Sequence, residues 1–122
     1  MRPISNYEFG DTEIKFIAFD AAQVSLNIFN PSKFEYVRLT LEGVSLFTFE
    51  TNAPQNVLES INILAGSDIQ DISFVNARLR SCGIDPGSID QNTHCIYVIP
   101  IAGPEILALC NAFRLETELA SV

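Results

Sequence analysis

Alternation of apolar and polar residues with a period of two is the feature of this chain that most restricts its fold. Residues 23–29 read Gln-Val-Ser-Leu-Asn-Ile-Phe, and residues 37–42 read Val-Arg-Leu-Thr-Leu-Glu. Because successive side chains of a β-strand point to opposite faces, each segment has an apolar face and a polar face when it is extended. The sequence therefore predicts two strands that bury one face and expose the other.

Four further segments have the composition of strands and lie between turn residues. They are rich in Ile, Phe, Val and Leu, and they occupy residues 13–19, 44–50, 58–66 and 95–101. Only three residues separate the first of them from residues 23–29, which predicts a hairpin. Pro100 limits the last one, because proline donates no backbone hydrogen bond and favours an edge or a strand end. Residues 52–55 predict a short helical turn.

One segment has the periodicity of a helix. Its apolar residues recur at steps of three and four, at Ile69, Ile72, Val75 and Leu79. Ser67 before these residues and Gly83 after them are types that begin and end helices. The sequence therefore predicts one main helix whose apolar stripe packs on the sheet. The following residues, 84–93, contain Asp-Pro-Gly-Ser and predict a loop.

The tail at residues 104–118 is compatible with two structures, and the sequence leaves both open. Pro104 and Glu105, followed by an apolar stripe, fit a helix that starts at the proline. Alternatively, residues 102–105 form a hairpin turn, after which Phe113 and Leu115 alternate with polar neighbours as a strand.

Together these segments predict an α+β fold: a mostly antiparallel sheet of five to seven strands with one main helix packed on it. The chain has 122 residues, and no repeat, low-complexity tract or linker divides it. We therefore expect residues 1–122 to form a single domain. Hydrophobic residues make up 48% of the chain, which suffices for one core and leaves a homo-oligomer open.

Charge excludes two classes of partner. The chain carries 15 acidic and seven basic residues, a formal net charge of −8. Nucleic acids and anionic membranes select for clustered Lys and Arg, so neither is an expected partner, whereas a basic protein remains compatible. The apolar run at residues 96–102 is far shorter than the roughly 20 residues that span a bilayer. The first thirty residues lack the basic and apolar regions of a secretory signal, so we expect a cytoplasmic protein.

Residues for catalysis or for metal binding are few. The three cysteines, Cys82, Cys95 and Cys110, show no C-x-x-C spacing, and His94 is the one histidine. We therefore expect free thiols, with neither a disulfide framework nor a zinc site. His94 and Cys95 are adjacent, so in one strand their side chains point to opposite faces and cannot form a catalytic pair. Glycine-rich phosphate-binding motifs are also missing, so we expect no cofactor and no enzymatic activity.

One local arrangement suggests a binding site. In Phe9-Gly10-Asp11-Thr12-Glu13, an aromatic ring precedes two carboxylates at alternate positions. If the segment is extended, Phe9, Asp11 and Glu13 project to one side, where the ring could anchor a basic partner and the carboxylates could pair with it. Alternatively, the same residues cap the first turn and face water.

This arrangement resembles the aromatic-x-Asp-x-Glu motif, usually with Trp, of a family of α+β immunity proteins from bacterial polymorphic toxin systems. The resemblance extends from residue 7 to about residue 64, through the strand at 37–41 and its Glu-Gly-Val-Ser continuation, and Phe9 stands where the family usually has Trp. It implies a protein that binds and neutralises a cognate toxin. Beyond that range Gly103, Ile106 and Cys110 resemble a closing hairpin, which favours the strand alternative for the tail.

The leading functional hypothesis is therefore a cytoplasmic binding protein, an immunity protein that sequesters a basic toxin by charge and shape. Acidic surfaces suit that role, because complementary charge raises association rates. Two alternatives stay open: a small enzyme with an acidic cleft, and a homo-oligomeric structural module.

Overall fold

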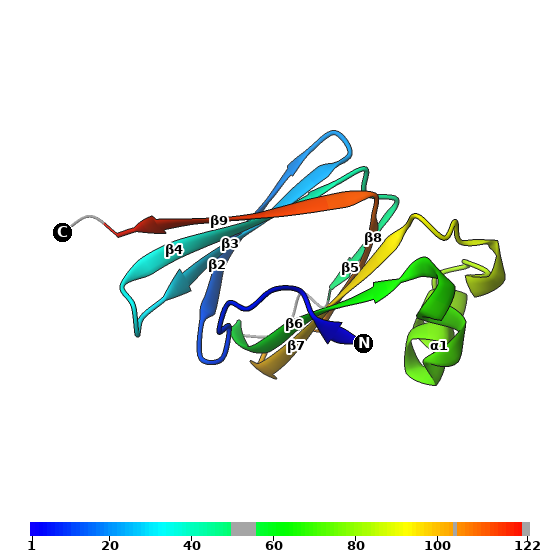
Figure 1. Ribbon diagram of the computed structural model, residues 1–122, viewed down its shortest axis with the longest axis horizontal. Helices are drawn as coiled ribbons and strands as arrows, with labels where there is room; N and C mark the ends of the chain where they lie inside the picture. Colours follow the sequence, from blue (N-terminus) through cyan, green and yellow to red (C-terminus); the bar gives the residue numbers. More distant parts are fainter. Residues whose placement is uncertain (50–55, 104, 121–122) are drawn as a thin grey trace.

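The structure, a computed structural model, describes residues 1–49, 56–103 and 105–120. Within these ranges nine strands form one antiparallel sheet (Figure 1). The strands are β1 (Arg2–Pro3), β2 (Glu13–Asp20), β3 (Gln23–Asn30), β4 (Glu35–Glu42), β5 (Leu46–Phe49), β6 (Val57–Ala65), β7 (His94–Ala102), β8 (Ile106–Cys110) and β9 (Ala112–Leu119). The helical segments are η1 (Gly66–Asp71), α1 (Ser73–Ser81) and η2 (Pro86–Ser88). None of the helices in the described ranges is long and apolar enough to cross a membrane.

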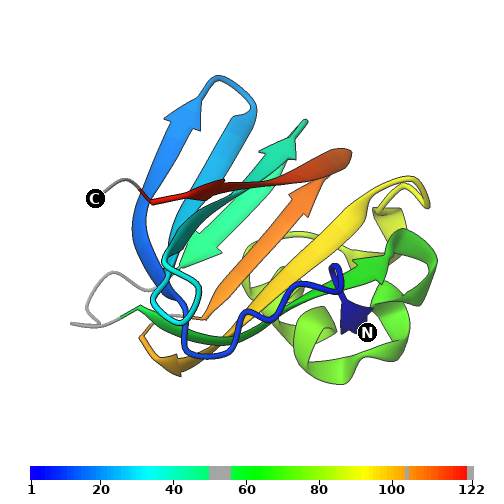
Figure 2. The ribbon, with the colours of Figure 1, turned by 60° about the vertical axis from the view of Figure 1, so that its left-hand side comes forward.

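The sheet folds over into two layers at one corner, where the chain passes from β4 to β5 and from β8 to β9. The strand order is β5-β8-β7-β6-β2-β3-β4-β9, yet β5 directly follows β4 and β9 directly follows β8. Gly43, with a φ of 64°, and Asn111 lie at this corner, where the Asn111 amide donates to the Glu42 carbonyl at 2.8 Å. One layer is therefore β2-β3-β4-β9 and the other is β6-β7-β8-β5 (Figure 2).

The main core lies between the two layers. Alternate residues of β3 and β4 point inward, as the period of two predicts, and they meet apolar residues of β6, β7 and β8. The fully buried members with the largest side chains include Leu26, Ile28, Leu39, Leu41, Leu58, Ile61, Ile96 and Ile106. Residues of the N-terminal segment, Ile4 and Phe9, are buried in the same core.

A second apolar cluster covers the outer side of the β6-β7-β8 layer. Ile69 of η1 and Val75 and Leu79 of α1 are fully buried against this side of the sheet. They pack on Leu64, Cys95, Tyr97, Leu107 and Leu109. Figure 1 shows α1 at the end of the molecule away from β3, β4 and β9. In the described part of the chain, the outer side of β2-β3-β4-β9 therefore has no helix over it.

The α+β fold with a mostly antiparallel sheet and one main helix is confirmed, whereas the expected number of strands is too low. The tail forms β8 and β9, not a helix, because each of these strands gains a partner ladder: β8 with β5 and β7, and β9 with β4. Tertiary pairing outweighs the weak helical preference of the tail. The turn expected at residues 52–55 lies outside the described residues.

Two further expectations concern the bounds of the predicted helix and the place of Pro100 in its strand. The predicted helix is divided in two, because Ile72 has an extended backbone with φ −106° and ψ 103° between η1 and α1. Pro100 lies inside β7, opposite Leu58 at a register shift of the β6–β7 ladder. The ladder of β7 with β8 ends before it, at Val98 and Ile106, so the missing N–H of Pro100 breaks no regular pairing.

Candidate functional site

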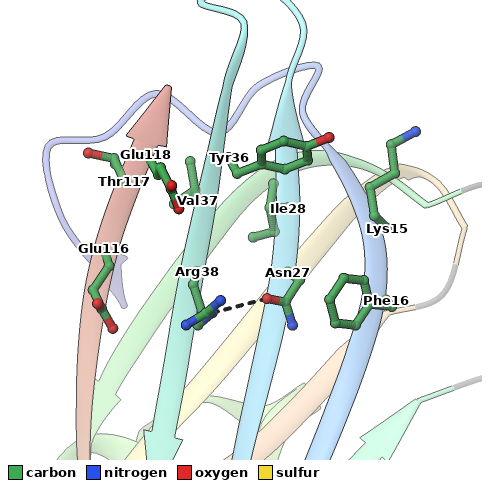
Figure 3. A pocket seen from close by; sticks show the side chains of 10 residues that line it. All are labelled: Lys15, Phe16, Asn27, Ile28, Tyr36, Val37, Arg38, Glu116, Thr117 and Glu118. Atoms are coloured by element: carbon green, nitrogen blue, oxygen red, sulfur yellow. Dashed lines mark hydrogen bonds between the residues drawn. The ribbon is translucent and has the colours of Figure 1, made fainter. Parts of the chain in front are cut away.

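The outer side of β2, β3, β4 and β9 carries a row of unlike side chains that crosses four strands. Phe16 pairs with Asn27, Asn27 pairs with Arg38, and Arg38 pairs with Glu116. A second row contains Phe29, Tyr36 and Glu118. All of these residues except Phe29, together with Lys15, line a depression of about 410 Å³ (Figure 3). We call this surface, which is defined by the residues of the two rows and Lys15, the open face.

Hydrogen bonds hold the arginine at the centre of the open face. Arg38 Nε donates to Asn27 Oδ1 at 3.1 Å, and Asn27 Nδ2 donates to Ser25 Oγ at 3.2 Å. Asn27 is only 9% exposed, so its amide is positioned by the strands around it. The Arg38 side chain itself is exposed, so its guanidinium also reaches solvent. An arginine fixed in this way loses little conformational entropy when it binds a ligand.

Large aromatic side chains of β2, β4 and the turn between β3 and β4 also remain in contact with solvent. Phe16 is 59% exposed, Tyr36 is 50% exposed, and Phe34 beside them is 45% exposed. The Phe29 ring supports two of them, with ring centroids 5.2 Å from Tyr36 and 5.8 Å from Phe34. Lys15 Nζ lies 5.9 Å from the centroid of Phe29 and 2.7 Å from Glu13 Oε2. The open face thus offers rings and charges side by side.

Acidic residues of β9 border the open face. Glu116 accepts a hydrogen bond from Arg114 Nε at 3.3 Å, and Arg114 also pairs with Glu42. Glu118 lines the depression opposite Tyr36. The border therefore carries more carboxylates than the Arg114 guanidinium neutralises.

The structure separates the three residues that the sequence predicts as a binding site. Phe9 is 4% exposed in the core, where its ring packs on Tyr7 at 4.9 Å. The segment is a turn, not an extended strand: the amide and hydroxyl of Thr12 donate to the Phe9 carbonyl at 3.0 and 2.6 Å, and Asp11 has a φ of 65°. The expected projection of Phe9, Asp11 and Glu13 to one side is therefore wrong. The carboxylates of Asp11 and Glu13 still reach solvent, and their contact with a partner stays a prediction.

The residues of the open face were not predicted as a site. The available signal was the presence of Arg38 and Tyr36 at polar positions of an alternating strand, where small polar residues are the ordinary choice. Such large side chains on the solvent side of a sheet are typical of recognition surfaces. Their grouping with Phe16 depends on the order of strands in the sheet, which alternation does not specify.

The two buried thiols, Cys95 and Cys110, lack the features of a nucleophile. Cys110 lies opposite His94 in the β7–β8 ladder, yet burial raises the pKa of the Cys110 thiol to about 11. Burial, with a smaller contribution from Cys110, raises the pKa of the Cys95 thiol to about 12. A nucleophilic cysteine needs the opposite shift, because the thiolate is the reactive form.

We expect one fast-reacting thiol in the folded protein. Cys82 is exposed, whereas Cys95 and Cys110 are buried, and all three are free. Iodoacetamide at pH 8 should therefore alkylate Cys82 within minutes and the other two only after unfolding, which intact mass measurement checks. Rapid alkylation of two or three thiols in the native state would contradict this burial.

Within residues 1–49, 56–103 and 105–120, no group of three or more His, Cys, Asp or Glu side chains could hold a metal ion. A larger depression of about 680 Å³ beside α1 has its charges already paired, with Arg78 Nη1 2.6 Å from Glu105 Oε1.

Comparisons with protein-family models, with curated proteins and with solved structures found no match for this chain.

Proposed function

We propose that this protein is a binding module that recognises a partner protein through the open face. The observation that supports this most is the grouping of Phe16, Tyr36 and the fixed Arg38 on the layer that no helix covers in the described ranges. Aromatic residues and arginine dominate binding energy at protein interfaces, and exposed lysine and glutamate usually form the rim. The open face has this composition, with rings and Arg38 inside and carboxylates along β9.

The proposed partner is a basic protein. The net charge of −8 attracts a positively charged partner over long distances, and Glu116 and Glu118 lie where they would meet its cations. The resemblance to immunity proteins agrees with this charge, so we propose a cytoplasmic immunity protein that neutralises a toxin without enzymatic activity of its own. Sequestration requires only that the bound surface of the toxin be covered.

The protein encoded by the gene adjacent to this one is the direct probe for this proposal. Purified separately, it should bind the chain tightly, and association should slow as ionic strength rises because salt screens the attraction. Interferometry at two salt concentrations measures both quantities. Absence of binding at micromolar concentrations, or a toxin activity that the chain leaves unchanged, would reject the immunity function.

The double substitution of Asp11→Asn and Glu13→Gln tests the contribution of the turn. Folding stability should change by no more than about 0.5 kcal/mol, because both carboxylates reach solvent and asparagine tolerates the positive φ of residue 11. Loss of two negative charges should slow association with the basic partner and weaken its salt dependence. Thermal unfolding and association rates at two ionic strengths measure these effects. A lowered melting temperature with unchanged association would assign the two residues to the fold alone.

A further inference from the structure

Strand β2 is paired along its length on one side and only at its start on the other. Its ladder with β3 extends from Glu13 to Asp20. On its opposite edge β2 pairs with β6 at Glu13 and Val57, and the Ile14 amide donates to the Asn56 carbonyl at 2.9 Å. Among the residues that the structure describes, no strand pairs with this edge from Phe16 to Asp20. Figure 3 shows Lys15 and Phe16 on the outermost strand of the layer.

This open edge is unusually apolar. Phe16 and Phe19 are each 59% exposed, Ala18 is exposed, and Ile17 is only partly buried. Exposed edge strands in soluble proteins are normally shortened, charged or covered, because their free N–H and C=O groups recruit other strands. Here charge occurs only at the ends of the apolar stretch, with Lys15 before it and Asp20 after it. The edge therefore has the composition of a surface that is buried in an interface with another chain.

The backbone of this edge fits a second copy of itself. Ala21 and Ala22 form a two-residue hairpin loop, so Asp20 and Gln23 exchange hydrogen bonds, and the alternation turns the peptide groups of Ile17 and Phe19 outward. A two-fold axis at Ala18 places Ile17 of one copy opposite Phe19 of the other. These outward groups then form four hydrogen bonds, and the apolar side chains of Ile17 and Phe19 meet on the same side of the extended sheet.

The charges of Lys15 and Asp20 are also compatible with a two-fold axis at Ala18. Lys15 and Phe16 lie on the outer side of the sheet, and Asp20 lies on this side too because it is four residues from Phe16 in the strand. The two-fold axis places Asp20 of the second copy opposite Phe16 of the first, next to Lys15 of the first. By symmetry, Asp20 of the first copy lies next to Lys15 of the second. Lys15 and Asp20 thus supply two opposite-charge contacts per pair of chains.

We infer that two copies of this chain associate edge to edge through antiparallel pairing of β2, with the two-fold axis at Ala18. The partner is a second copy because the edge is complementary to itself in hydrogen-bond pattern and in charge. Such an axis is perpendicular to the sheet, so the two open faces lie side by side on one surface of the dimer. This inference does not depend on the proposed function, since it concerns only the chain with itself.

Sedimentation equilibrium of the purified chain over a concentration series measures the dimer directly. We expect a reversible dimer, and Phe19→Lys should raise its dissociation constant at least about tenfold by placing a charge in the ladder. The matched control is Phe74→Lys on α1, a residue 47% exposed and remote from β2, which should leave the dissociation constant unchanged. A chain that stays monomeric at every concentration, or a dimer that Phe19→Lys leaves intact, would overturn the inference.

Exchange of the charges of Lys15 and Asp20, which are both exposed, tests the register in which the two β2 strands pair. Lys15→Glu and Asp20→Lys should each raise the dissociation constant about tenfold, because each change converts two attractive contacts into repulsive ones. The double variant Lys15→Glu/Asp20→Lys should return the dissociation constant to within about threefold of the wild-type value. Circular dichroism confirms that each variant is folded. Failure of the double variant to restore association would overturn the two-fold axis at Ala18.

Discussion

Replacement of Leu39 by alanine should lower the free energy of unfolding by about 2–5 kcal/mol. Leu39 is 0% exposed in the core between the layers, and its neighbours across the β3 and β9 ladders are Leu26 and Leu115. Truncation removes buried methyl groups and leaves a cavity that the surrounding strands fill only in part. Because small domains have a total stability of about 5–15 kcal/mol, urea unfolding should shift clearly to lower concentration.

The matched control for this substitution is Leu119→Ala. Leu119 lies in β9 in the same ladder, opposite Glu35, but its side chain is 76% exposed. We expect its truncation to change stability by no more than about 0.5 kcal/mol. Equal effects of the two substitutions would contradict the assignment of the space between the layers as the core.

Replacement of Tyr36 and Arg38 together by alanine should lower affinity for the adjacent-gene protein about 30-fold or more. This factor corresponds to the roughly 2 kcal/mol by which an interface hot spot is defined. Tyr36 is 50% exposed and Arg38 is held by Asn27, so both side chains are available and positioned before binding. Dissociation should become faster and association should change little, because contact residues at the centre of an interface act mainly on the dissociation rate.

The control pair for this variant lies on the other side of the molecule. Phe74 and Arg80 of α1 are an exposed ring and an exposed arginine, and Arg80 Nε donates to Asn76 Oδ1 at 2.9 Å much as Arg38 does to Asn27. Phe74→Ala/Arg80→Ala should leave affinity unchanged. A stronger loss with this pair than with Tyr36→Ala/Arg38→Ala would move the binding surface to α1.

Alternation predicted the strands around the core because it reports the apolar side of a strand, and the buried apolar residues of β3 and β4 all lie on one side. The tail was ambiguous because β8 is buried on both faces, so its residues read Ile-Leu-Ala-Leu-Cys without a period. The corner at Gly43 and Asn111 depends on the pairing of two distant segments, which local sequence does not specify. The fold class could therefore be predicted, and the two-layer arrangement could not.

The geometry expected for the predicted site was wrong because it depended on the backbone of one short segment. Phe9 was expected on the surface, but its ring fills the core between the layers, because the turn at Asp11 directs the segment inward. The open face combines Phe16, Arg38 and Glu116 from three strands that are distant in the sequence. Only the order of strands in the sheet brings them together, so no motif could have identified them.

Chemical-shift mapping of the ¹⁵N-labelled chain with the adjacent-gene protein tests the proposed recognition surface most directly. We expect shifts and line broadening to concentrate at outward residues of β2, β3, β4 and β9, with Tyr36 and Arg38 among the largest. Residues of α1 should remain unchanged. Recognition through the open face would be contradicted if the shift changes were centred on α1 or confined to the turn at Asp11. It would also be contradicted if an equimolar amount of the partner caused no shift changes.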